Sequence, residues 1–121
     1  MGTDEFRRNM NDLEALSLEI EQAPEFKMDP ATSSRTELLH RFNLHRAMVN
    51  LLHFVTVHMM RADAEDYDLE SEKWILSALD KASEDIRIGL ARPLPVNVRH
   101  LAERAQNLTN GILANIHTIA A

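Results

Sequence analysis

The stretch from Ser34 to Ala62 constrains the fold of this chain more than any other, because it contains neither proline nor glycine and predicts one continuous helix. It opens with Ser34, Arg35, Thr36 and Glu37, the pattern of a capping box, in which a hydroxyl and a carboxylate each accept a bond from a free backbone N–H. A helix of about 28 residues is roughly 42 Å long. With 3 glycines and 4 prolines in 121 residues, the chain also lacks the turn signals of a β-sandwich.

Three further segments carry apolar residues at helical spacing and predict three more helices. They cover residues 4–22, 69–91 and 97–118, with a linker at 23–33 that contains Pro24 and Pro30. Pro93 and Pro95 end the third predicted helix, and Asn97 is the expected N-cap of the fourth. We therefore expect one all-α domain over residues 1–121, a four-helix up-down bundle with one long central helix.

Composition argues against several classes of protein. Without cysteine, the chain can form neither disulfides nor thiolate sites. Its first ten residues lack the apolar region of a secretion signal. The longest nearly apolar run, residues 51–60, is far shorter than the ~20 residues that a membrane span needs. We expect a cytoplasmic protein that neither enters a membrane nor carries a cofactor.

Metal and catalytic sites are not expected either. No two of the 6 histidines are three or four residues apart, the spacing at which two ligands on one helix face the same ion. Glu37 and His40 match half of a carboxylate-bridged di-iron motif, whose second Glu-x-x-His is absent. The candidate serine nucleophiles fall within or at the start of predicted helices, with no strained turn to present them. We expect a protein that is not an enzyme.

Nucleic-acid binding is a minor alternative. The net charge of −6 repels phosphate backbones. A basic cluster near the C-terminus keeps direct DNA binding open as a third option; it consists of Arg87, Arg92, Arg99 and Arg104.

The predicted helix over 34–62 is apolar around most of its circumference. Its apolar arc spans roughly 260°, where a helix covered on one side needs little more than 100°. The first apolar group comprises Leu38, Phe42, Val49, Leu52, Met59 and Met60, and the second comprises Leu44, Ala47, Leu51, Phe54 and Val55. Either the other helices surround this one completely, or one group faces the core and the other is an exposed patch for a partner.

We expect the second group to be the exposed patch, because His40 and His58 lie on the same side and frame its ends with polar groups. Trp74 projects away from the apolar stripe of its own helix, as an interface anchor would, although it could instead cover the end of the long helix. The predicted partner-binding residues are His40, Leu44, Ala47, Leu51, Phe54, Val55, His58 and Trp74.

A short, acidic, cysteine-free helical chain whose long helix offers a spare apolar face resembles the small quorum-sensing antiactivators of the QslA and TraM kind. The resemblance covers most of the chain in size and helical layout and includes no diagnostic motif. It implies a non-catalytic regulator that binds a LuxR-type transcription factor and blocks that receptor's dimerisation or its hold on DNA. The leading alternative is a homodimeric helical bundle that uses the same patch on itself and senses a small apolar ligand.

Overall fold

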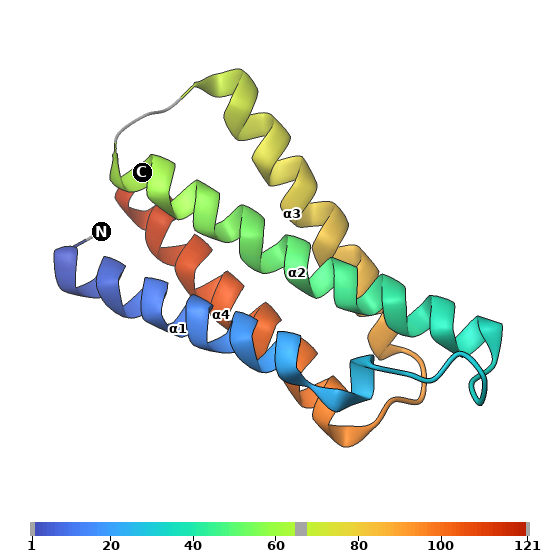
Figure 1. Cartoon of the computed structure of the whole chain (residues 1–121). Coiled ribbons are helices and arrows are strands. Elements are labelled where there is room, and N and C mark those ends of the chain that lie inside the picture. The colour runs from blue at the N-terminus through green and yellow to red at the C-terminus, as the bar shows by residue number, and fades with distance from the viewer. Residues whose placement is uncertain (1, 65–67, 121) are drawn as a thin grey trace.

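A computed structural model of the chain describes residues 2–64 and 68–120, with side chains up to residue 116. These residues form four α-helices, one short 3-10 helix and no strand (Figure 1), which confirms the predicted all-α bundle. The elements are α1 (Thr3–Gln22), η1 (Pro24–Phe26), α2 (Arg35–Asp63), α3 (Leu69–Leu90) and α4 (Val96–Ala120). Each α-helix begins and ends within two residues of its predicted bounds.

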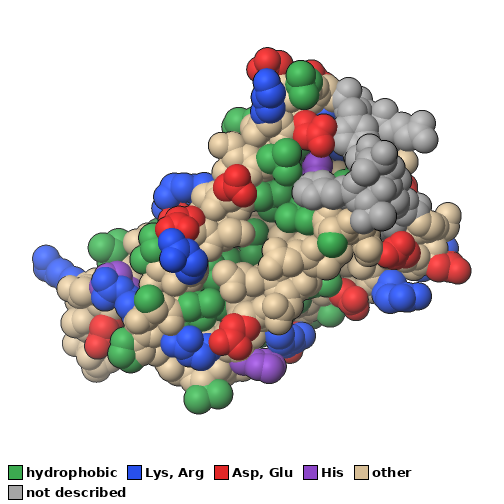
Figure 2. Space-filling view, turned by 180° about the vertical axis from the view of Figure 1, so that it is seen from behind, with side chains coloured by type: hydrophobic (Ala, Val, Ile, Leu, Met, Phe, Trp, Pro, Cys, Tyr) green, Lys and Arg blue, Asp and Glu red, His purple; other side chains and the backbone are tan. Residues whose placement is uncertain are grey.

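Helix α2 is the axis of the bundle, since α1, η1, α3 and α4 all contact it. Helices α1 and α2 run antiparallel, and α4 lies behind them and contacts both (Figure 1). Helix α3 makes the most extensive contact with α2, and its N-terminal half projects from the rest of the bundle. Seen from behind, hydrophobic side chains gather beside this projecting half (Figure 2).

Local hydrogen bonds define where the helices begin. The Ser34 hydroxyl oxygen accepts a bond from the Glu37 backbone N–H at 3.1 Å, so the predicted N-cap of α2 is present. Asp68 caps α3 in the same way. The predicted N-cap of the fourth helix is wrong: α4 already begins at Val96, directly after a proline, and the Asn97 amide instead donates to the Glu25 carboxylate at 3.1 Å.

The segment after α1 packs against the start of α2. Ala23 is buried, and the Phe26 ring contacts the His45 ring edge to face, with centroids 4.8 Å apart. The Arg41 guanidinium donates a hydrogen bond to the Glu25 carbonyl oxygen at 2.6 Å. These contacts place the C-terminal end of α1 beside the N-terminal part of α2.

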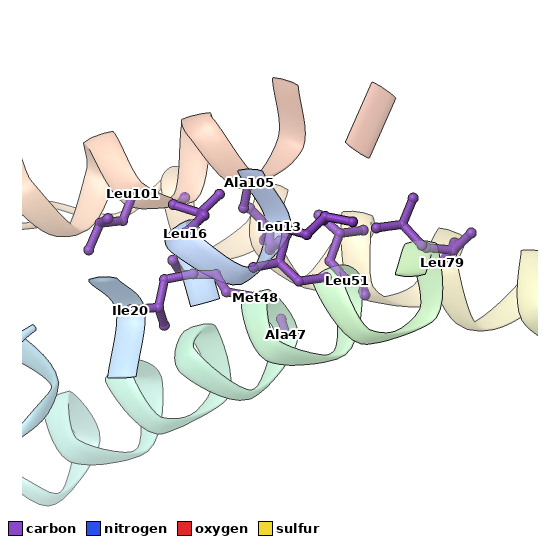
Figure 3. Packing of buried hydrophobic residues seen from close by; sticks show 14 of the residues in the cluster. Leu13, Leu16, Ile20, Ala47, Met48, Leu51, Leu79, Leu101 and Ala105 are labelled. Carbon is purple, nitrogen blue, oxygen red and sulfur yellow. The ribbon is translucent and has the colours of Figure 1, made fainter. Parts of the chain in front are cut away.

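The core lies between α1, α2 and α4 and extends to α3. In Figure 3 three side chains of α1 face α2 and α4; they are Leu13, Leu16 and Ile20. Met48 and Leu51 enter the same cluster from α2, and Leu101 and Ala105 enter it from α4. Each fully buried leucine or isoleucine contributes roughly 1.5–3 kcal/mol, so this cluster is what holds α1 to the bundle.

Candidate functional site

Most of the predicted partner patch is core. Leu44, Ala47, Leu51, Val55 and His58 are all buried, and Leu51 exposes 1% of its surface. The reason is α3, which packs along this side of α2 and brings Gly89 against Leu44. The expectation that the second apolar group of α2 is exposed is therefore wrong.

The remaining three predicted residues stay accessible to different degrees. His40 and Phe54 are half-buried, whereas Trp74 exposes 63% of its surface. His40 borders a smaller groove of about 290 Å³ between α2 and α3, away from the aromatic rings. The structure thus keeps Phe54 and Trp74 together and separates them from His40.

The first apolar group of α2, which was expected to face the core, is divided by the structure. Leu52 and Met59 are buried, whereas Phe42, Val49 and Met60 lie on an exposed apolar face. We define the α2 seam as seven residues that alternate three and four positions apart: Leu39, Phe42, Arg46, Val49, His53, Thr56 and Met60. Four of them are large apolar side chains that expose between 45% and 61% of their surface. This spacing lets one helix pack against another along its length.

A groove of about 590 Å³ lies between α1 and α2 beside the α2 seam. No residue of α4 lines it, so it lies on the side of the α1–α2 pair that α4 leaves open. Its floor is apolar and its rim is polar. From α1 the lining includes Met10, Leu13, Glu14, Ser17, Ile20 and Glu21, and from α2 it includes His45, Val49, Leu52, His53 and Thr56.

The carboxylates on the rim of this groove are exposed. Glu14 and Glu21 lie on the α1 rim, and His53 of the α2 seam lies on the other rim. Arg46, also on the seam, instead borders the smaller groove between α2 and α3. Within residues 2–64 and 68–116, none of these four takes part in an ion pair. The Arg46 guanidinium lies 5.9 Å from the centroid of the Phe42 ring, which keeps its charge over the seam.

A row of aromatic rings connects the groove to α3. The His53 and Phe54 rings meet edge to face with centroids 5.1 Å apart, and Phe54 meets Trp74 in the same way at 5.3 Å. Trp74 therefore combines the two expected roles: it covers part of α2 through Phe54 and leaves most of its surface open.

Other chemistry has little support in the described part of the chain. It contains no group of three or more histidine, aspartate or glutamate side chains placed to hold a metal ion. None of its helices combines the length and the apolar character needed to cross a membrane.

The basic cluster near the C-terminus is largely engaged within the protein. Arg87 pairs with Glu84, and Arg104 donates two hydrogen bonds to the Glu19 carboxylate, at 3.0 and 2.6 Å. Arg99 donates to the carbonyl oxygens of Leu90 and Arg92. Three of the four arginines thus have structural partners.

Sequence reasoning missed the groove and the α2 seam. The signal that distinguishes the two apolar faces of α2 is polarity: Arg46 and His53 interrupt the exposed face, whereas His58 is the sole polar member of the buried one. No protein-family model matches the chain, and comparison with curated proteins and with solved structures found no match either.

Proposed function

We propose that this chain is a non-catalytic, protein-binding regulator that takes an amphipathic helix into the groove between α1 and α2. The observation that carries the proposal is the open groove of about 590 Å³, whose apolar floor continues into the exposed α2 seam. Contiguous apolar surface rimmed by polar groups is typical of interaction sites. An amphipathic helix laid in such a groove is a common mode of recognition.

The shape of the site favours a helix over an extended peptide. The groove runs between two antiparallel helices, and α4 already packs against both of them from the other side. A further helix can pack there by the same ridge-and-groove contacts. An extended strand would instead require an exposed sheet edge, and the described residues form no strand.

An antiactivator of a LuxR-type transcription factor is the specific form of this function that we favour. It rests on the resemblance in size and helical layout to the small quorum-sensing antiactivators. In this form, the groove covers a helix that the receptor uses for dimerisation or for binding DNA. The net charge of −6 and the structural roles of Arg87, Arg99 and Arg104 favour action through the receptor over direct contact with DNA.

A small apolar ligand is the second candidate, and the volume of the groove is the observation that favours it. Small-molecule sites commonly enclose about 300–1,000 Å³, with mostly apolar walls and a few polar groups. The groove falls within that range, and its lining includes six polar residues: Glu14, Ser17, Glu21, His45, His53 and Thr56.

Site-specific photo-crosslinking in native cells tests the proposal. A photoreactive amino acid replaces Ser17, an exposed residue of the groove, and adducts are identified by mass spectrometry. We expect a protein adduct that is lost when Val49→Glu places a charge in the groove. The matched control is Val96→Glu, the same substitution at a position that is 85% exposed and lies at the start of α4.

The outcomes separate the candidates. An adduct that persists in the Val49→Glu variant contradicts docking in the groove. A Val49-sensitive adduct with a protein other than a transcription factor retains the binding function and rejects the antiactivator form. If Ser17 yields no protein adduct while the purified chain carries an apolar small molecule, the second candidate takes its place.

A further inference from the structure

Arg92 is the one member of the basic cluster whose side chain the bundle does not engage. It follows the C-terminal end of α3, and its backbone is held on both sides: the N–H donates to the Gly89 carbonyl oxygen at 3.2 Å, and the carbonyl oxygen accepts from Arg99 at 3.1 Å. Its guanidinium has no hydrogen bond or ion pair within residues 2–64 and 68–116. A fixed backbone thus presents a free cation to the groove of about 290 Å³ between α2 and α3.

This α2–α3 groove is lined mainly by cations, although the net charge of the chain is −6. Three basic side chains line it, and they are Arg46, Lys81 and Arg92. The single carboxylate in the lining, Asp85, already pairs with Lys81 at 3.0 Å. The two arginines therefore have no carboxylate partner in the described residues, and the groove has a local charge opposite to that of the protein.

The cations stand at both ends of the groove. Arg92 and His40 also line the adjoining hollow at the start of α2, so they mark that end. Arg46 lies six residues beyond His40, about 9 Å further along α2. Between the ends α3 approaches α2 closely, because Gly89 has no side chain and a Cβ there would lie 3.0 Å from Leu44 Cδ1. The close approach of the two helices forms the floor of the groove.

We propose that the α2–α3 groove binds a small molecule that carries a phosphate or carboxylate group and a short apolar body. Arg46 and Arg92 bind the anionic group, and the half-buried His40 adds a further polar contact. Ile88, which is 54% exposed beside them, contacts the apolar body. This site goes beyond the proposed function, since it shares no lining residue with the groove between α1 and α2.

The electrostatics of the groove favour an oxyanion. Like charges that line one cleft repel each other, and a bound anion relieves this repulsion. The guanidinium group also matches the geometry of carboxylate and phosphate, to which it can donate two parallel hydrogen bonds. Arg46 is available for this role, because its contact with the Phe42 ring, 5.9 Å from the centroid, supplies no acceptor oxygen.

The size of the groove favours a small molecule over a macromolecule. Its volume of about 290 Å³ is half that of the groove between α1 and α2 and lies near the lower end of the range for small-molecule sites, about 300–1,000 Å³. A nucleic acid would bring many further phosphates against a chain of net charge −6. A single anionic group meets the local cations without that repulsion.

Nuclear magnetic resonance titration of the whole chain at constant ionic strength tests the proposal. Phenyl phosphate and benzoate share one ring and differ in the anionic group, and benzyl alcohol is their uncharged counterpart. We expect saturable shifts of the backbone amides of Asn43 and Gly89 with at least one of the two anions and none with benzyl alcohol. Tighter binding of phenyl phosphate identifies a phosphate site, and tighter binding of benzoate identifies a carboxylate site.

Two substitutions test the arginines. Arg46→Gln and Arg92→Gln should each raise the dissociation constant about tenfold, because each removes a charged hydrogen-bond donor. Arg8→Gln, the same change at an exposed residue of α1 outside both grooves, should leave it unchanged. Far-UV circular dichroism checks that each variant is folded.

A third substitution should act in the opposite direction. Asp85→Asn removes the carboxylate that occupies Lys81 and should lower the dissociation constant about threefold. Glu103→Gln removes an exposed carboxylate of α4 outside the groove and is the matched control.

Three results would overturn the oxyanion site. The first is the absence of saturable shifts with both anions at millimolar concentrations. The second is an affinity that Arg46→Gln and Arg92→Gln leave unchanged or that Arg8→Gln lowers equally. The third is binding of benzyl alcohol as tight as that of the anions, which would show that the ring alone is recognised.

Discussion

Trp74 of α3 meets Phe54 of α2 edge to face, with ring centroids 5.3 Å apart and ring planes at 83°. The contact lies on the half of α3 that projects from the bundle, and Phe54 in turn touches the ring of His53. An indole that is 63% exposed thus links α3 to the aromatic row beside the groove.

The first prediction concerns this ring pair. Edge-to-face aromatic pairs contribute about 0.5–1.5 kcal/mol beyond their area burial. We expect a double-mutant cycle of Trp74→Ala and Phe54→Ala, measured by urea unfolding, to give a coupling energy of about 1 kcal/mol. Leu69→Ala, a change at another exposed residue of α3, should not couple to Phe54→Ala. A coupling near zero would show that the two rings are neighbours without mutual stabilisation.

The second prediction separates the two apolar faces of α2. Leu51→Asp buries an unpaired carboxylate at a position that is 1% exposed, and we expect the loss of several kcal/mol to unfold the protein. Phe42→Asp places the same group at a position that is 61% exposed, and we expect the free energy of unfolding to fall by no more than about 1 kcal/mol. Thermal melting followed by circular dichroism compares them. Equal losses would mean that the α2 seam is itself covered, as in an obligate dimer.

The third prediction concerns the ion pair between α1 and α4. Hydrogen bonds from Arg104 hold the pKa of the Glu19 carboxyl below its ordinary value. Because the folded pKa is the lower one, the pair stabilises the fold above the ordinary pKa of a glutamate, and this contribution is lost as the pH falls through the folded pKa. Both side chains are about half exposed, so Glu19→Gln should lower the free energy of unfolding at pH 7 by less than about 1 kcal/mol.

The measurement for this pair is urea unfolding at pH 7 and at pH 3. The difference between wild type and Glu19→Gln should become smaller at the lower pH, because the carboxyl is increasingly protonated as the pH falls. Glu84→Gln, which removes the carboxylate that pairs with Arg87 within α3, is the matched control and should have a smaller effect because it links no two helices. An equally large difference at pH 7 and pH 3 would indicate that Glu19 stabilises the fold through packing and not through its charge.

The fourth prediction compares two helical glycines. Gly111 of α4 has no atom within 4 Å of an added Cβ, so Gly111→Ala should stabilise the protein by about 1 kcal/mol through helix propensity. A Cβ at Gly89 would lie 3.0 Å from Leu44 Cδ1, so Leu44 would have to move within the core. We expect Gly89→Ala to gain less than half as much, or to lose stability. Equal increases in melting temperature for the two variants would show that Leu44 can move away from the added Cβ at no cost in stability.

The fold was predictable because each signal for it is local. Helix bounds follow from the apolar spacing, from Ser34 as a cap and from Pro93 and Pro95 as stops, and each of these acts within a few residues. The missed cap at Asn97 has a tertiary cause, since its amide bonds to Glu25 in a distant segment.

The site was not predictable in the same way. A helix that is apolar over roughly 260° does not reveal which neighbour covers which face. That depends on where α3 and α1 pack around α2, which is a property of the whole fold. The exposed face contains the charged residue Arg46, whereas the buried face has the apolar residue Leu44. Comparing the two faces for polar residues would have favoured the correct assignment.

The central position of α2 also determines how the protein can open. Since α1, α3 and α4 all pack on this helix, none of its middle turns can lose its hydrogen bonds without releasing the elements that cover it. Amide hydrogens around Met48, Leu51 and Val55 should therefore exchange with solvent at the rate set by global unfolding. Amide hydrogens in the projecting half of α3 should exchange through local opening. Exchange rates should therefore be slow in the middle of α2 and faster in the N-terminal half of α3.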